Sequence, residues 1–497
     1  MTRSPAHPGR SILFAYAGIA VPAGIAVILV PLLLRNLGQT RFGLLSLLLS
    51  VAAFFMNFDF GTGPALARYT ARLRARSASG GRVRRLALAG MTVQACVGLG
   101  TAAILFIALR VFGLSSAVTA GIGAGEFDRA VALVAVATPF ALQSGGARSV
   151  LEGLGRFGVA NVIRAPASAS TFAAPIAVSF FSPRLDLMMA GLLAARMATS
   201  GAFGWAMWAA LPARAGRITL AYVLRVGKRL LSYGGWVMLG VAAGGLVSLG
   251  ILDRMLIDRR LGPAAIVSYS IPSDIVLRCL LAPGAIASVL IPLLSGAVAR
   301  SLAFGPALDR AAAIISAQIG PLALVLVLQA DWILQLLARG YVGPSSRDVL
   351  QAMALGLYVH AVAHAPYAAL QALGRPNHAA LRHVVELPFY AVASYLLVRN
   401  GRVEFLGALW TAWTLADMAI LVWLVRSLRP DVRRAQAGLG VRFAFWAAAL
   451  GAAIAATRLG LPRGIAIAIS AVCLVYWAFG TFQLAFGDTE SLRFRHE

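Results

Sequence analysis

The sequence is poor in lysine and in acidic residues. Lys228 is the only lysine, and 18 Asp and Glu stand against 44 Lys and Arg, which gives a net charge of +26. A P-loop needs the pattern G-x-x-x-x-G-K-[ST], and this pattern does not occur around Lys228. The sequence therefore excludes a P-loop, and we expect no nucleotide as a partner or energy source.

Charged residues of both signs are scarce. They make up 12% of the chain, whereas 60% of it is hydrophobic, and a soluble domain usually carries about 25% charged residues. Binding of nucleic acid would need a basic face on a folded soluble domain, and no segment has this character. The composition predicts an integral membrane protein whose partner is the lipid bilayer, with no nucleic acid.

Cysteine is also rare. Cys96, Cys279 and Cys473 lie far apart in apolar stretches, so they form neither a metal-binding spacing nor a disulfide framework. His360 and His364 lie four residues apart, but two histidines without further ligands do not make a zinc site. Packing beside Pro366 and proton relay remain alternatives for this pair, and we expect no metal or cofactor.

Long apolar runs dominate the rest of the chain. A helix needs about 20 apolar residues to cross the hydrocarbon core. The first run is long enough to span, and no cleavable signal peptide is evident before it. The sequence predicts an all-α integral membrane protein of about fourteen spans, at 11–34, 42–66, 86–109, 129–147, 160–182, 187–212, 230–252, 265–298, 311–337, 350–372, 381–398, 403–425, 443–457 and 462–486.

The connecting loops are short and carry most of the basic residues. If the N-terminus is cytoplasmic, the inside segments hold about twice as many Lys and Arg as the outside ones, as the positive-inside rule requires. We expect a multi-pass protein of the inner (plasma) membrane with both termini cytoplasmic. Short loops without a catalytic constellation count against a membrane enzyme of glycan assembly.

Two short phrases occur twice. LEGLGRFGVAN at 151–161 is echoed by LQALGRPN at 370–377, and RNLG at 35–38 by RRLG at 259–262. Each pair is separated by six predicted spans, and repeats with an even number of spans are parallel, as in two-lobed transporters. The alternative is that LGR is a common helix-end phrase.

This repeat predicts three parts. An N-terminal lobe of six spans covers residues 1–212, and a C-terminal lobe of six spans covers 213–430. Two appended helices and a tail follow at 431–497. The two lobes are expected to face each other across a central cavity.

The stretch RNLGQTRFGLLSLLLSVAAFFMNFDFGTGPALARYTAR at 35–72 and the stretch LDRMLIDRRLGPAAIVSYSIPSDIV at 252–276 carry a family resemblance. With the two LGR phrases, they resemble the polysaccharide transporters of the multidrug/oligosaccharidyl-lipid/polysaccharide (MOP) exporter superfamily, above all its O-antigen and exopolysaccharide flippases. The resemblance implies alternating access. It also implies transfer of an undecaprenyl-pyrophosphate-linked oligosaccharide from the cytoplasmic to the periplasmic leaflet, with a polysaccharide polymerase and other assembly proteins as further partners.

Ionisable residues inside spans are costly and are candidates for function. Arg196 lies in the middle of the sixth predicted span, and Asp274 and Arg278 lie on one face of the eighth. An arginine fork suits a phosphate, because it makes two charge-assisted hydrogen bonds. We expect Arg196, Arg278 and Asp274 to line the substrate cavity, although the last two can also form a structural ion pair.

Further candidates flank these spans. Arg68 and Arg72 begin a run of arginines after the second span and lie nearest the cavity mouth. Arg164 lies near a span end, where its side chain can reach the interface.

Two acids are candidates for coupling to an ion. Asp59 and Asp417 lie deep in predicted spans, and Asp59 either binds a coupling ion or only braces the lobe. The energy source is left open between an ion gradient and consumption of the cargo. Lipid II or a small cationic drug remains an alternative cargo, and cavity arginines argue against the drug.

Overall fold

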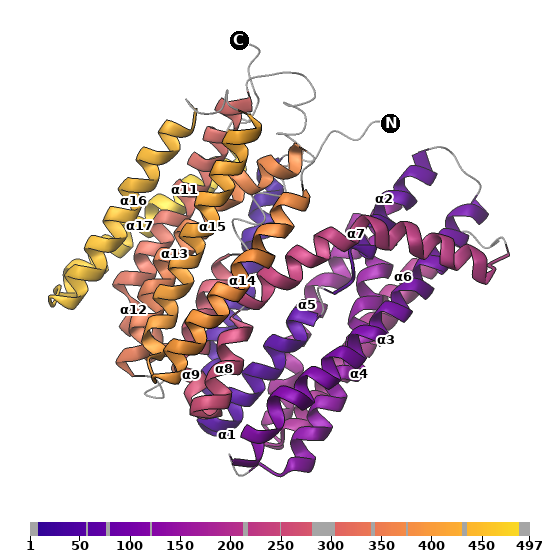
Figure 1. The fold of residues 1–497 in the computed structure, drawn as a ribbon, viewed down its shortest axis with the longest axis horizontal. Coiled ribbons are helices and arrows are strands. Elements are labelled where there is room, and N and C mark those ends of the chain that lie inside the picture. The colour runs from indigo at the N-terminus through magenta and orange to yellow at the C-terminus, as the bar shows by residue number, and fades with distance from the viewer. Residues whose placement is uncertain are drawn as a thin grey trace. The chain divides into compact units, whose positions relative to one another are not determined.

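The computed structural model describes residues 8–55, 58–75, 80–119, 122–211, 217–248, 250–280, 304–338, 343–373, 376–429 and 435–486. Every regular element in these ranges is a helix, and none of them is a strand (Figure 1). Ten of the described helices are long and apolar enough to cross a membrane. The all-α membrane fold is confirmed, but the described residues do not confirm the count of fourteen spans. Residues 281–298 of the eighth predicted span lie outside the described residues.

The helices before residue 280 follow one another with short connections. They are α1 (Pro8–Phe55), α2 (Thr62–Ala75), α3 (Gly80–Thr119), α4 (Ala124–Gly153), α5 (Phe157–Ser179), α6 (Leu185–Ala210), α7 (Leu220–Ser248), α8 (Ile251–Leu261) and α9 (Pro263–Cys279).

The later helices complete the chain. They are α11 (Phe304–Leu328), α12 (Ala330–Ala338), α13 (Pro344–Ala372), α14 (Pro376–Arg399), the 3-10 turn η1 (Val403–Phe405), α15 (Leu406–Leu428), α16 (Ala435–Arg458) and α17 (Arg463–Phe486). The two C-terminal helices predicted from the sequence are α16 and α17.

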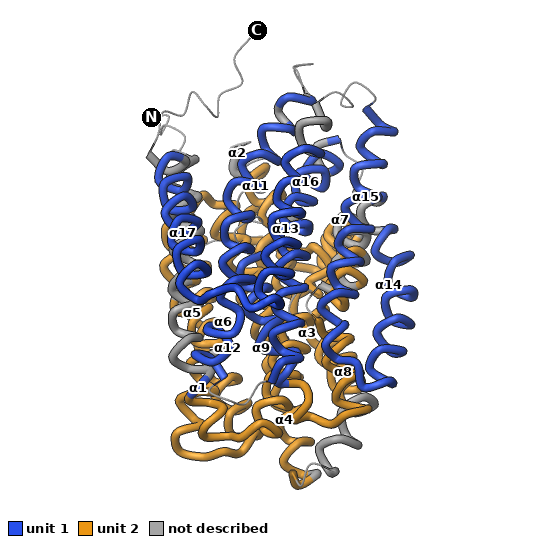
Figure 2. The backbone as a smooth tube through the Cα atoms, turned by 90° about the vertical axis from the view of Figure 1, so that its left-hand side faces the viewer, with its two compact units in different colours: residues 1–31, 267–497 blue, residues 32–266 orange. Residues whose placement is uncertain are grey.

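The chain divides into two compact units (Figure 2). Unit 2 is Leu32–Ile266, and unit 1 is Met1–Pro31 with Val267–Glu497. Helix α7 belongs to unit 2 because Val226 and Leu230 pack into a core with Leu66 of α2 and Val83 of α3. The boundary between the units thus lies at Ile266, later in the chain than the predicted lobe boundary at 212. The lobes at 1–212 and 213–430, which were inferred from the repeat, stay a prediction.

The predicted span 42–66 is interrupted. Helix α1 ends at Phe55, and a turn leads into α2 at Thr62. Phe60 and Gly61 both adopt left-handed backbone, with φ of 52° and 63°. Asp59 therefore lies in a turn and not inside a helix, because two consecutive left-handed residues cannot continue a right-handed one.

Asp59 caps the helix that follows it. Its Oδ1 accepts a hydrogen bond of 2.8 Å from the Gly61 N–H, and its Oδ2 accepts one of 3.1 Å from the Gly63 N–H. The first N–H groups of a helix have no partner within it, so a carboxylate at this place stabilises the helix start. A Cβ on Gly63 would lie 2.8 Å from Asp59 Oδ2, which explains the glycine.

The shorter repeated phrase has a counterpart in the backbone. Gly38 ends RNLG with φ 69° and ψ 172°, and it interrupts α1. Gly262 ends RRLG with φ 86° and ψ 165°, between α8 and α9. Glycine adopts this conformation without the steric cost that a Cβ imposes, so the two phrases make the same kind of helix break.

Within unit 1, α13 is the central helix. It packs against α11, α12, α14, α15 and α16, and Leu357, Val359 and Ala361 have no exposed surface. Its contact with α15 depends on small residues, since a Cβ on Gly407 would lie 2.6 Å from the Val349 carbonyl oxygen. Small residues let helix backbones approach closely in membranes.

Helix α11 holds both C-terminal helices. Gln318 accepts a hydrogen bond of 2.9 Å from Thr481 of α17, and Trp446 of α16 packs against Gly320. Their outer faces are exposed and apolar, as at Val475, which is 70% exposed. Such faces suit contact with lipid.

Replacement of Gly43 by alanine tests the packing beside the first glycine break. An added Cβ would meet the Pro263 carbonyl oxygen and would lie 2.9 Å from its carbon. We expect Gly43→Ala to lower the stability of the purified protein by about 1–3 kcal/mol through overpacking, measured as an earlier thermal transition in detergent. Gly201→Ala is the matched control, because nothing lies within 4 Å of its added Cβ. Equal transitions for the two variants would contradict the close contact.

Candidate functional site

Unit 2 contains a cavity of about 470 Å³. Its walls are parts of α1, α4, α5 and α6. The volume falls within the range of about 300–1,000 Å³ typical of small-molecule pockets. The cavity can therefore hold a group as large as a small molecule.

Three arginines line this cavity. Arg148 comes from α4, Arg164 from α5 and Arg196 from α6. Among the described residues that line it, none is acidic, and five carry hydroxyl groups: Thr138, Ser144, Ser168, Thr171 and Thr199. Arg148 has a partner outside the lining set, since its Nε lies 3.6 Å from Glu152 Oε1. The cavity presents cationic and hydroxyl donors, which is the donor set that binds phosphate and sugar oxygens.

The cavity walls are tied together near one end. Glu126, in the first turn of α4, accepts a 2.6 Å hydrogen bond from Arg41 Nη1 and a 2.8 Å one from the Leu185 N–H. It thereby joins α1 to α4 and caps α6. Asp186 accepts a 2.9 Å hydrogen bond from Arg129 Nε, which joins α6 to α4 a second time. These bonds fix the spacing of three of the four walls.

The predicted cavity residues fall in several places. Arg196 lies half-buried at the cavity wall. Arg68 and Arg72 lie exposed on α2, and Asp274 and Arg278 lie half-buried on α9. Of these five residues, the described lining of the unit 2 cavity includes only Arg196.

The sequence reasoning missed Arg148 and assigned Arg164 to the interface. A signal was present, because both arginines lie at similar distances from the turn at Gly155 that joins α4 to α5. Two helices joined by a short turn run antiparallel, so residues at equal distances from the turn lie at similar depth.

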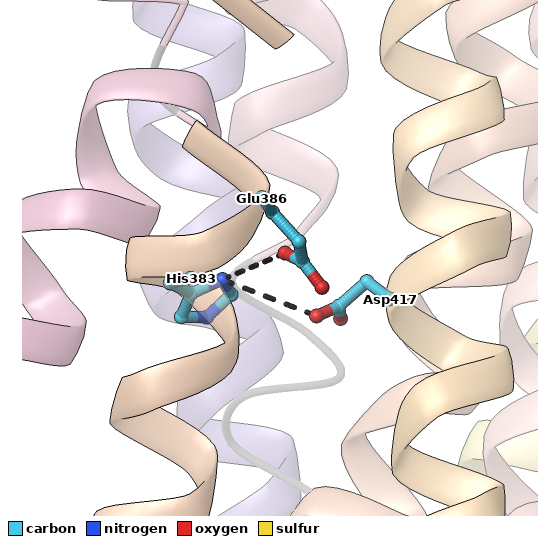
Figure 3. A group of neighbouring side chains, drawn as sticks. All are labelled: His383, Glu386 and Asp417. Atoms are coloured by element: carbon cyan, nitrogen blue, oxygen red, sulfur yellow. Dashed lines mark hydrogen bonds and ion pairs between the residues drawn. The ribbon is translucent and has the colours of Figure 1, made fainter. Parts of the chain in front are cut away.

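A second site surrounds Asp417 in unit 1. Arg382 Nη1 lies 2.7 Å from Asp417 Oδ1, and both side chains are buried. His383 Nδ1 lies 3.3 Å from Glu386 Oε2 and 3.9 Å from Asp417 Oδ1. Figure 3 shows the His383 ring facing the two carboxylates, which come from α14 and α15.

Aromatic side chains enclose this cluster. Trp413 Nε1 donates a 2.9 Å hydrogen bond to Glu386 Oε2. The Trp413 ring centroid lies 5.9 Å from that of His383 and 6.1 Å from that of His360. His364 Nδ1 lies 2.9 Å from the His360 carbonyl oxygen, so this histidine pair packs along α13 beside the cluster.

The cluster of Arg382, His383, Glu386 and Asp417 has an unbalanced charge. One guanidinium faces two carboxylates, so one negative charge remains when His383 is neutral. A buried charge is costly unless it is compensated, and either a proton on the cluster or a small cation supplies the balance. Ligand atoms of His383, Glu386 and Asp417 lie within 4.8 Å of one another, which is close enough to share one ion. The guanidinium at Asp417 disfavours a divalent ion and favours a single positive charge.

Asp417 was a candidate from the sequence, whereas Arg382 and His383 were not. Glu386 and Asp417 lie nearly the same number of residues from the turn at Gly401 that joins α14 to α15. Equal distance from the turn places Glu386 at the depth of Asp417. Arg382 and His383 lie one turn of α14 from Glu386, so the sequence could have placed them near Asp417 as well.

Comparison with known proteins identifies transporters. The chain is 23% identical over 409 residues to the "Putative O-antigen transporter" of Shigella flexneri, a match that covers 82% of this chain and 95% of that protein. No family model matches the sequence. The resemblance to polysaccharide transporters inferred from the sequence is confirmed.

Solved structures with the same fold are also transporters and flippases. The structure of the lipid II flippase MurJ in an inward closed conformation matches with a TM-score of 0.66 and 12% identity, over 94% of this chain and 98% of that one. An inward-facing multidrug resistance MATE family transporter of the MOP superfamily matches with a TM-score of 0.61 and 14% identity, over 86% and 98%. These likenesses show the fold.

Substitutions at the Arg382–Asp417 pair test the buried cluster. We expect Arg382→Ala to lower stability by about 3–5 kcal/mol, because it leaves buried carboxylates uncompensated. The double variant Arg382→Met, Asp417→Leu should be more stable than Arg382→Ala, since it removes both partners. The measurement is the thermal transition temperature of the purified wild type, single variant and double variant in detergent. A double variant less stable than the single one would contradict the pairing.

Proposed function

We propose that this chain, a membrane transporter or flippase of the MOP type, moves an undecaprenyl-pyrophosphate-linked oligosaccharide across the inner membrane. The oligosaccharide is an O-antigen or exopolysaccharide repeat unit. It passes from the cytoplasmic to the periplasmic leaflet.

The single observation that carries this proposal is the arginine-lined cavity of unit 2. A pyrophosphate is the most strongly charged part of such a cargo, and arginine forks bind phosphate oxygens in pairs. Arg148, Arg164 and Arg196 supply those forks, and the hydroxyl groups around them suit sugar oxygens. The lipid tail stays in the bilayer, where it loses no contact with hydrocarbon.

The same observation orders the alternative cargos. A small cationic drug prefers an acidic or aromatic cavity, so a wall with three arginines disfavours it. Lipid II is the second candidate, because a MurJ flippase shares the fold and lipid II also carries a pyrophosphate. The similarity to a protein named for O-antigen transport favours the oligosaccharide.

The proposed cycle is alternating access between the two predicted lobes at 1–212 and 213–430, with both termini cytoplasmic. Arg68 and Arg72 receive the headgroup near the cavity mouth, and Arg196 holds it inside. Arg278 and Asp274 contact it from the second lobe. A polysaccharide polymerase consumes the cargo outside.

Ion coupling is proposed at the buried cluster around Asp417. Its one uncompensated negative charge is balanced by a single positive charge, and the arrival or departure of that charge changes the cost of keeping the cluster buried. Asp59 is the second candidate for coupling. Its hydrogen bonds from the Gly61 N–H in the turn and the Gly63 N–H in α2 already give it a structural role.

Loss of cavity arginines should impair transport. In a strain lacking the gene, we expect Arg196→Ala and Arg164→Ala to restore surface polysaccharide about tenfold less well than the wild type, because each removes a charge-assisted contact with phosphate. Arg278→Ala is expected to fail likewise. The measurements are the amount of surface polysaccharide and the amount of undecaprenyl-linked repeat units that accumulate. The level of each variant in the membrane is measured beside them.

Arg399→Ala is the matched control for this experiment, since Arg399 is exposed at the end of α14. It should complement like the wild type. Full complementation by both Arg196→Ala and Arg164→Ala would contradict the cavity assignment. Accumulation of lipid II in place of repeat units would favour the second cargo.

Asparagine substitutions separate coupling from helix capping. Asparagine keeps only one of the two acceptor oxygens of Asp59, so Asp59→Asn should lower stability by about 1 kcal/mol and should abolish gradient-driven transport only if Asp59 binds the coupling ion. Asp417→Asn should abolish the dependence of transport on an imposed ion gradient in proteoliposomes. Unchanged gradient dependence in both variants would contradict coupling at these two acids.

A further inference from the structure

The first half of α7 is unlike the other helices of unit 2. It was expected to be a loop up to residue 229, but α7 begins at Leu220 and runs obliquely to α3 in Figure 1. Residues 220–231 have three faces around the helix: one packs against protein, one is apolar and exposed, and one is basic.

One face of this segment packs against protein. Val223, Val226 and Leu230 lie three or four residues apart, which places them on one side of a helix. They join the core formed by α2, α3, α4 and α6, with Val226 and Leu230 buried. The segment is thereby fixed to the body of unit 2.

A second face is apolar and exposed. Leu220, Leu224 and Leu231 follow an i, i+4, i+11 spacing, so they form one stripe. Their exposed fractions are 74%, 64% and 39%. A stripe of exposed leucines beside a packed face is typical of a helix that touches the acyl boundary of a bilayer.

The third face is basic. Arg225, Lys228 and Arg229 lie at i, i+3 and i+4, and all three are exposed. The sequence has no Asp or Glu between Asp186 and Asp253, so all the charged side chains of this segment are basic. An interfacial helix typically has leucines that face acyl chains on one side and basic groups that reach headgroups on the adjacent side.

Neighbouring elements extend the basic surface. The Arg85 guanidinium lies 3.8 Å from the ring centroid of Tyr222 in α7, and that of Arg84 lies 4.2 Å from the Trp208 ring at the end of α6. Cation–π contacts hold these arginines at the same end of unit 2 as the first half of α7. Arg82 is exposed beside them.

We propose that the first half of α7, residues 220–231, is an interfacial helix that binds anionic phospholipid headgroups of the bilayer through Arg225, Lys228 and Arg229. The occupant is bilayer lipid rather than cargo, because the basic face adjoins an exposed leucine stripe that needs acyl chains beside it. This site is separate from the arginine cavity, which involves none of the α7 residues. The proposal does not depend on which cargo is carried.

The test measures lipid selectivity of the full-length protein. Purified protein in neutral detergent is titrated with phosphatidylglycerol or phosphatidylcholine, and bound lipid is counted by native mass spectrometry. The variant is Arg225→Gln, Lys228→Gln. Each basic group near an anionic surface contributes about fivefold in binding, so the double variant should bind phosphatidylglycerol roughly 25-fold more weakly, with phosphatidylcholine binding unchanged.

The matched control is Arg399→Gln, Arg402→Gln, which removes one exposed arginine at the end of α14 and one in the turn that follows it. It should bind phosphatidylglycerol like the wild type. Equal loss in this control, or full retention in the α7 variant, would overturn the proposal. Inorganic pyrophosphate is added as a competitor: displacement of phosphatidylglycerol from the wild type at micromolar pyrophosphate would assign the surface to the cargo headgroup instead.

Discussion

Hydrocarbon offers no hydrogen bonds, so a membrane-spanning chain must satisfy its own polar groups wherever a helix begins, ends or carries a charge. This constraint explains several contacts together. Asp59 supplies acceptors for the start of α2, and Glu126 supplies one for the start of α6. Arg382 compensates Asp417, and Trp413 donates to Glu386. These polar groups are each matched to a partner from another turn or helix, and the matches help to fix how the helices pack.

The two units differ in the sign of their buried chemistry. The cavity of unit 2 is lined by arginines and hydroxyl groups, whereas the cluster of unit 1 carries one more carboxylate than guanidinium. An anionic headgroup fits the first arrangement and a proton or small cation fits the second. The proposed cargo site and the proposed coupling site thus use residues of different units, so substitutions can change one without removing residues of the other.

Much of this arrangement could be read from the sequence, and the failures have definite causes. Hydropathy predicted the helices, and position within a span predicted that Arg196 would reach a cavity. Hydropathy carried one predicted span through the turn at Asp59, although Gly61, Gly63 and Pro64 beside it are residues typical of turns. The partners of Asp417 come from another helix, so local spacing did not indicate them. Distance from a shared turn carries that information for Arg382 and His383.

The glycine breaks at Gly38 and Gly262 share one backbone conformation, although the side chains around them differ. Such breaks depend on the freedom of a residue without a Cβ and not on charge or polarity. The path of the backbone at these two breaks is therefore specified separately from the residues that line the arginine cavity. Exchange of wall residues on α5 and α6 would therefore alter what the arginine cavity binds and leave the glycine breaks in place.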